Sequence, residues 1–420
     1  MSEHLTIDRE KQARLQHIIQ SLHAGKPVAE VKKEFARLID GVSAAEVAEM
    51  EQALIEGGMP VEEVQRLCEV HVEVFRSSLG KSGTSVTTPG HPLHTMQEEN
   101  RQARRHIRAL KKAVIAWRLG LGEADAVAQA LEALSPIIIH YTRKENQLFP
   151  YLERVQFTGP SRVMWGKHDE IRTMLKEARQ RLSRHDKSAI GVLHQLVHAM
   201  SRMIFMEEHI LFPEAQRRLS DRDWAEIRLG EDAIGFAWIR PGALYDPHLV
   251  LAGAIGPGKG REPGSSAPAP SAPVPAPGDA DTAVQPLLEL ATGQVPRELL
   301  NLALTTMPVD ISIVDDQDRV VYYSDSPHRL FPRSPAVIGR AVQNCHPQKS
   351  VATVNRILEA FRKKEKSKAR FWLEMGGRFI LIEYHALYDA QGRYVGTLEF
   401  SQDLTELRAL EGQRRLLDWD

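Results

Sequence analysis

Apolar residues recur every three or four positions through most of the first two thirds of the chain, as they do on one face of an α-helix. Between short Gly, Pro or polar joints, this pattern predicts long helices at about residues 92–119, 123–154, 160–185 and 187–219. Four such helices with short joints predict an up-down-up-down bundle. A shorter helix near residues 221–228 and an irregular cap follow.

Strand-like runs replace the helical pattern in the last third of the chain. The segments DISIVD, RVVYYS, ARFWLEM, RFILIEYHALYD and YVGTLEFS are rich in β-branched and aromatic residues. Residues 256–280 are mostly Pro, Gly, Ala and Ser, and this composition predicts a semi-extended linker. We therefore expect a multidomain chain that is all-α first and α+β afterwards. The expected domains are a small helical domain at 1–80, the bundle with its cap at 90–250, the linker at 251–284, and an α+β domain with a C-terminal helix at 285–420.

Composition and charge narrow the class of protein. The formal net charge of the 420 residues is −1, so bulk electrostatics favours neither nucleic acid nor an acidic membrane as a partner. The two cysteines, Cys68 and Cys345, are far apart in the sequence, and the first residues lack the apolar core of a signal peptide. No apolar run reaches the roughly 20 residues that span a bilayer. We therefore expect a cytoplasmic protein with no membrane segment.

The second and fourth predicted helices contain a repeat. HYTRKENQLFPYLE and MIFMEEHILFPEAQ align on Leu-Phe-Pro. In this alignment Glu145 corresponds to Glu208, and His140 corresponds to Met203. At about 100° per residue, Glu145 and Glu208 fall within the apolar faces of their helices, and Glu207 lies at the edge. A buried carboxylate costs several kcal/mol unless it is paired or binds a cation. The repeat therefore predicts a metal site, with salt bridges to Arg or Lys as the alternative.

Histidines supply further candidate ligands. His168 lies on the apolar face of the third helix, whereas His140 lies about a third of a turn from the centre of its helix face. His91 and His94 are one turn apart at the start of the first helix. Imidazole together with carboxylate suits iron, manganese or zinc. The alternative for each histidine is an ordinary hydrogen-bonded or surface position.

The segments GHPLH, HYTRKENQLFP, KHDEI and EEHILFP resemble the hemerythrin-like, or HHE cation-binding, family over about residues 90–220. The resemblance implies a non-haem di-iron centre held by histidines from four helices and glutamates from two. Helix one would supply His94 or His91, helix two His140 and Glu145, helix three His168, and helix four Glu208 or Glu207.

Two residues depart from the pattern of that family. In the usual helix-two pattern, His-x-x-x-Glu, the last position is Lys144, with Glu145 one residue later, and Met203 stands where helix four usually has histidine. Either the helices bulge locally and re-aim Glu145, or another domain donates ligands. A different metal, a mononuclear centre or haem are further alternatives.

The first 80 residues include side chains that could act as further metal or haem ligands. Residues 18–79 resemble a helical domain of unknown function (type 438) that commonly precedes hemerythrin-like domains. Cys68 and His71 form a Cys-x-x-His pair on one helix face, a spacing compatible with metal or haem ligation. The alternative is a buried thiol and a capping or solvent-exposed histidine.

Residues 295–405 resemble a PAS sensor domain, with two strands, helices and three longer strands ending in GTLEFSQDLTEL. Cys345 and His346 lie on the connection where PAS ligands often bind. They would provide a reactive thiol or a haem ligand, and the alternative is ordinary loop packing. In PAS proteins a helix such as ELRALEGQRRLLDW, which follows here, pairs with a second copy or relays a signal. We therefore expect a homodimer or a downstream protein partner.

Together these features predict a cytoplasmic sensor of O2, NO or redox state, with a non-haem di-iron centre coupled to the PAS domain. Glu145 and Glu208 would balance the metal charge, while His168, His140 and His94 would fix its geometry. The alternatives are a haem-binding sensor, a di-iron enzyme that reduces nitric oxide, acts as a peroxidase or repairs iron centres, and a metal-free scaffold.

Overall fold

The computed structural model describes residues 88–253, 287–326 and 329–413. By their contacts, the described residues up to 252 together with 334–355 form one compact unit, and the other described residues form a second. In the described part of the chain, no helix is long and apolar enough to cross a membrane.

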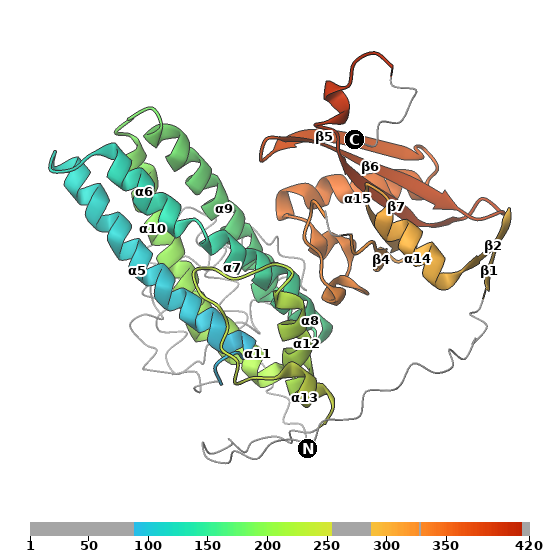
Figure 1. The fold of residues 1–420 in the computed structure, drawn as a ribbon, viewed down its shortest axis with the longest axis horizontal. Helices are drawn as coiled ribbons and strands as arrows, with labels where there is room; N and C mark the ends of the chain where they lie inside the picture. The colour runs from blue at the N-terminus through green and yellow to red at the C-terminus, as the bar shows by residue number, and fades with distance from the viewer. Residues whose placement is uncertain (1–87, 254–286, 327–328, 414–420) are drawn as a thin grey trace, which may run out of the picture. The chain divides into compact units, whose positions relative to one another are not determined.

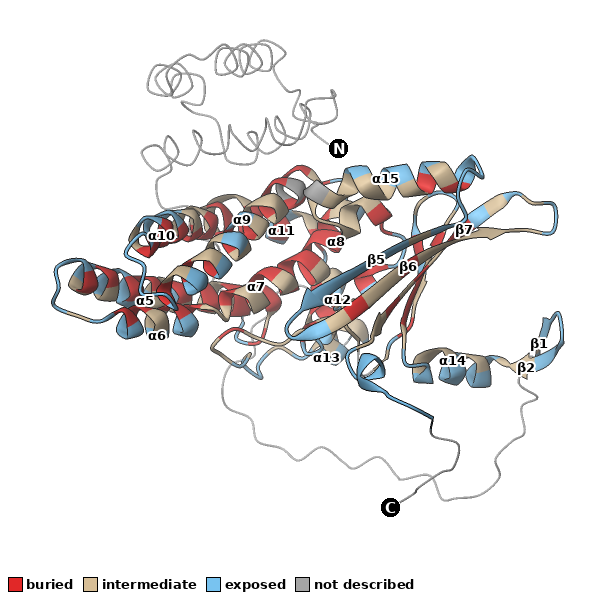
Figure 2. Ribbon diagram, turned by 90° about the horizontal axis from the view of Figure 1, so that it is seen from above, coloured by how far each residue is buried: buried red, intermediate tan, exposed pale blue. Residues whose placement is uncertain are grey.

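The first unit contains the predicted four-helix bundle (Figure 1). Helix α5 packs against α6 and α10, and α9 packs against the same two helices. Figure 2 shows that buried residues follow the inward faces of these helices. Leucine, isoleucine, valine and methionine fill the core, as the helical period predicts. The elements in chain order are α5 Pro92–Arg118, α6 Ala124–Leu134, α7 Ile137–Arg143, the π-helical turn η1 Lys144–Leu148, α8 Phe149–Arg154, α9 Gly159–Leu182, α10 Ala189–Met206, the π-helical turn η2 Glu207–Leu211, α11 Phe212–Arg218, α12 Asp221–Glu231 and α13 Pro247–Leu251.

The second and fourth predicted helices are not continuous α-helices. The second is interrupted at Pro136, which stands at the N-cap of α7, and both contain a π-helical turn. Proline disfavours an unbroken helix because it has no N–H and its ring meets the carbonyl four residues earlier.

The α+β region contains a five-stranded antiparallel sheet in the order β4-β3-β7-β6-β5. A separate pair of short strands precedes it. The elements are β1 Leu287–Leu290, β2 Gly293–Pro296, α14 Arg297–Thr306, β3 Asp310–Asp315, β4 Val320–Tyr323, the 3-10 turns η3 Pro335–Val337 and η4 Val342–Cys345, α15 Gln348–Arg362, β5 Lys368–Met375, β6 Arg378–Tyr388 and β7 Tyr394–Asp403.

The predicted C-terminal helix does not form over the residues described after β7. Residues 404–413 contain only the 3-10 turn η5, Leu407–Ala409, and Gly412 has a positive φ of 66°. Such a φ is incompatible with a right-handed helix. The remaining part of that expected helix lies outside the described residues.

Gly90 holds the start of α5 against the cap that follows α12. Its φ is +99°, and a Cβ there would lie 2.1 Å from the carbonyl oxygen of Gly242. We expect Gly90→Ala to lower the free energy of unfolding by more than Gly120→Ala. Gly120 has a φ of +72° but no heavy atom within 4 Å of an added Cβ, so its replacement adds only backbone strain of about 1–2 kcal/mol. Chemical denaturation of the two variants checks this, and equal losses would contradict it.

Candidate metal centre

The two π-helical turns, η1 and η2, occupy equivalent places in the repeat. In each, the N–H of the Phe in Leu-Phe-Pro donates to a carbonyl five residues earlier, from Phe149 to Lys144 and from Phe212 to Glu207. A proline follows each Phe. The local bulge considered for helix two is therefore present, and helix four contains it too.

The bulges determine which side chains of the repeat face the interior. Lys144 and Glu207, at equivalent positions, are both fully buried and form an ion pair with each other. Glu208 instead forms a bidentate pair with Arg104, at 2.5 Å for each of its two oxygens, and its side chain is 22% exposed. The structure thus brings Glu207, not Glu208, to the centre.

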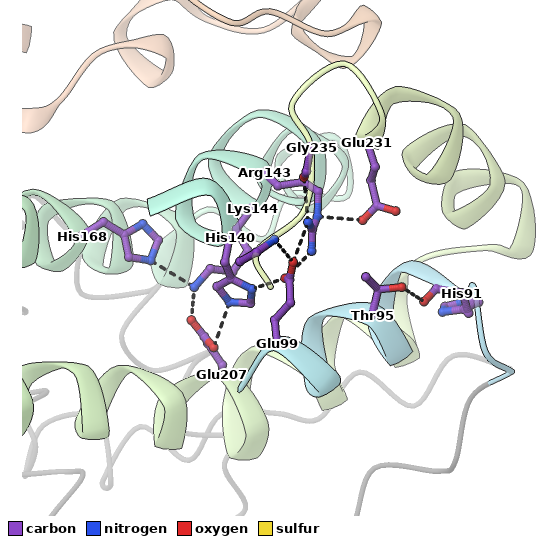
Figure 3. A network of polar contacts seen from close by, with 11 residues as sticks. His91, Thr95, Glu99, His140, Arg143, Lys144, His168, Glu207, Glu231 and Gly235 are labelled. Atoms are coloured by element: carbon purple, nitrogen blue, oxygen red, sulfur yellow. Dashed lines mark hydrogen bonds and ion pairs between the residues drawn. The ribbon is translucent and has the colours of Figure 1, made fainter. Parts of the chain in front are cut away.

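Four fully buried side chains meet in the centre (Figure 3). The Nε2 atom of His140 lies 3.3 Å from Oε2 of Glu207. The Nζ atom of Lys144 lies 3.1 Å from Nε2 of His168, and it also contacts Oε1 of Glu207. One imidazole and one carboxylate therefore contact the ammonium group directly, and the second imidazole contacts the same carboxylate.

Each imidazole is oriented by a carboxylate on its other nitrogen. Nδ1 of His140 lies 2.7 Å from Oε2 of Glu99, and Nδ1 of His168 lies 2.7 Å from Oε1 of Glu145. Metal-binding histidines commonly have such a carboxylate partner, which fixes the tautomer and leaves Nε2 toward the ion. Glu145 thus acts on the centre through His168.

Glu99 was not among the residues predicted from the sequence. Arg143 Nη1 and the N–H of Ala237 donate to its Oε1, at 2.9 and 2.7 Å. Arg143 also donates to the carbonyl of Gly235 at 3.0 Å and pairs with Glu231, again at 3.0 Å. Burial raises the pKa of Glu231 to about 7. The polar Glu99 within the apolar face of the first helix was the signal that would have revealed it.

Burial and neighbouring charges set the protonation of the centre. Burial opposes ionisation of Glu207, yet Lys144 and His140 hold the pKa of its carboxyl well below the usual range. Burial, reinforced by the charge of Lys144, holds the pKa of His168 well below its usual value. The ring of His168 is therefore neutral, the form that binds metals.

The remaining histidine candidates on α5 have other roles. Nδ1 of His91 accepts a hydrogen bond from the N–H of Leu93 at 3.1 Å and caps α5. Burial, with a further effect of His94, lowers the pKa of His91 to about 4. His94 lies 3.8 Å from Glu98 on the same helix, with its side chain 20% exposed. The structure does not bring either imidazole to the centre.

The cysteine candidates also lie elsewhere. Cys345 Sγ donates to the carbonyl of Ala341 at 3.7 Å, and Nδ1 of His346 lies 2.8 Å from the carbonyl of Val342, so both contact the backbone of their own turn. Cys68 and His71 lie outside the described residues.

Two imidazoles and one carboxylate are donors of the kind that suit a metal ion. As the described side chains stand, no three His, Cys, Asp or Glu residues are arranged to hold a metal, and Nζ of Lys144 contacts both His168 and Glu207. Nevertheless, two oriented imidazoles and a carboxylate converge there, and the buried hydroxyl of Tyr141 has no hydrogen-bond partner. A single ion would fit this position if Nζ moved away.

Residues 334–355 cover the outside of η1. Pro150 has no N–H, so the carbonyls four and five residues before it receive no hydrogen bond from it. The hydroxyl of Ser334 donates to the carbonyl of Asn146 at 2.6 Å, and Nη1 of Arg340 donates to the carbonyl of Glu145 at 3.2 Å. Hydrogen-bond donors from residues 334–355 thus contact the π-helical turn that carries Lys144.

Arg340 is itself buried and paired. Its Nε and Nη2 donate to the two carboxylate oxygens of Glu153, at 2.7 and 2.8 Å. We expect Arg340→Met to lower the free energy of unfolding of this unit by about 1–3 kcal/mol, because the largely covered Glu153 would lose its cationic partner and keep only its contacts with Ser161 and Asn344. Hydrogen exchange should accelerate in residues 144–154 and 334–355. The exposed Arg356→Met is the control, and equal exchange in the two variants would contradict the prediction.

Comparisons with known proteins match three regions of the chain. Residues 15–81 match a family of unknown function (DUF438), residues 91–215 the hemerythrin HHE cation binding domain, and residues 300–405 a PAS domain. A search of curated proteins finds no match.

Three solved structures each resemble part of this chain. A C-terminal domain from Streptococcus mutans is 30% identical, with 30% of this chain and 98% of that chain covered and a TM-score of 0.29. A sensory box sensor histidine kinase from Vibrio cholerae is 16% identical, with 26% and 92% covered and a TM-score of 0.21. A PAS domain from Colwellia psychrerythraea is 17% identical, with 26% and 97% covered and a TM-score of 0.22.

Proposed function

We propose that this chain, which contains a DUF438 region, a hemerythrin HHE cation-binding domain at residues 91–215 and a PAS domain at residues 300–405, is a sensor of oxygen, nitric oxide or redox state. The hemerythrin domain implies a metal, and we propose that a single iron ion in the bundle is the sensing group. The observation that supports this is the convergence of His140, His168 and Glu207, with each imidazole held by a carboxylate on Nδ1.

Two histidines and one carboxylate form the donor set typical of non-haem iron(II), although manganese and zinc accept the same donors. When bound, iron would supply reversible electron exchange or an open position for a diatomic ligand. Side chains of the protein would orient the ligands of the ion. Glu99 and Glu145 hold the two rings, and their charge raises the basicity of the imidazoles. Complete burial of His140, His168 and Glu207 excludes water.

The route from the centre to the PAS domain would pass through residues 334–355. These residues contact η1 through Ser334 and Arg340 and belong to the same unit as the bundle, although they lie within the PAS sequence. Helix α15 begins within this segment and continues into the second unit. A change in η1 would therefore alter hydrogen bonds of a segment that is covalently continuous with the sheet. The output partner would be a second copy or another protein.

Metal content tests the proposal. Protein produced with ample iron should contain about one iron per chain, and His140→Ala and Glu207→Gln should each lower the affinity for Fe²⁺ at least tenfold, since each removes one of three donors. Equilibrium dialysis without oxygen, with an absorption spectrum of each sample, measures this.

His94→Ala is the matched control, because the structure places that imidazole on the first turn of α5 and not at the centre. Iron content that is unchanged in the His140 and Glu207 variants would show that the site is elsewhere. A Soret band in the purified protein would favour haem instead.

A further inference from the structure

Lys144 lies among the side chains that would hold a metal ion at the proposed position. Its Nζ lies between His168 Nε2, at 3.1 Å, and the carboxylate of Glu207, and the ring centroid of Tyr141 lies 4.7 Å away. Ammonium, like a metal ion, satisfies a carboxylate and lies favourably near an aromatic ring. The side chain is fully buried, so no solvent shares this role.

The described carboxylates around the centre each have a cationic side chain of the protein as partner. Glu207 pairs with Lys144, Glu99 with Arg143, and Glu145 with Arg172 at 2.7 Å. An unpaired carboxylate at this depth would cost several kcal/mol. Because Lys144 supplies the missing charge, the centre is balanced without any metal ion.

We infer that Lys144 is a tethered cation that competes with metal for one position, so that the centre has an ammonium-filled state and a metal-filled state. This inference rests on the proposed metal position at His140, His168 and Glu207. The two states exclude each other, because an ammonium and a divalent ion cannot share one small, dry space at close range. Metal affinity is therefore set in part by how firmly Lys144 is held.

Replacing Lys144 with an uncharged residue tests the competition. Lys144→Met keeps an unbranched side chain and removes the charge, while Lys144→Gln keeps a hydrogen-bond donor. Both should bind Fe²⁺ about tenfold to a hundredfold more tightly than the unaltered protein, because a hydrogen bond to a charged group no longer has to be broken. Equilibrium dialysis without oxygen gives the affinity, and Zn²⁺ serves as a probe that does not change oxidation state.

Thermal unfolding gives an independent measurement. Without metal, both variants should unfold at a lower temperature than the unaltered protein, since Glu207 loses its partner. Added Zn²⁺ should raise the unfolding temperature more in these variants than in the unaltered protein or in Lys176→Met, which changes an exposed lysine on α9. If the Lys144→Met variant does not fold, the same measurements on Lys144→Gln test the competition.

The outcomes separate this inference from the proposed function. Metal binding of equal strength with and without Lys144 would overturn the competition while leaving the metal sensor intact. Binding only by the Lys144 variants would support the inference and contradict a metal-based function of the natural sequence. Failure of every protein to bind either ion would overturn both.

Discussion

The ion pair between Lys144 and Glu207 joins the two copies of the repeated segment inside the bundle. The copies carry opposite charges at equivalent positions, so their two π-helical turns attract each other instead of both presenting carboxylates to an ion. Each side chain is fully buried, and removing either one would leave a charge without compensation in a medium of low dielectric constant. The arrangement of the surrounding polar groups follows from this pair.

The charged groups around the pair are subject to the same requirement, since each buried carboxylate needs a cationic partner. Glu99 and Glu145 must be balanced, and Arg143 and Arg172 balance them while each carboxylate also holds one imidazole. Because every member has more than one partner, the histidine rings have little freedom to turn. The cost of burying so many charges is offset only when the network is complete, which makes the centre specific in geometry.

The sequence predicted the bundle and the PAS sheet because their apolar periods are regular over many residues. The inward residues were harder to predict where the period changes. A π-helical turn contains one more residue than an α-helical turn. A projection at 100° per residue placed Glu145 and Glu208 within the apolar faces and Glu207 at the edge, whereas in the structure Lys144 and Glu207 form the buried pair. The Leu-Phe-Pro repeat was visible, but the identity of the inward residue depended on the bulge. Glu99 was missed because its partners come from residues about 40 and 140 positions away.

The same π-helical turn connects the interior with the segment outside it. Lys144 projects inward from η1, while the carbonyls of Glu145 and Asn146 accept hydrogen bonds from Arg340 and Ser334. A ligand shifts an equilibrium only as far as it binds one state more strongly than the other. If Lys144 leaves the centre when an ion enters, the two states differ in a side chain carried by the turn that these outside donors contact. A tethered cation would thus couple ion binding to η1 directly, because the side chain that the ion displaces belongs to that turn.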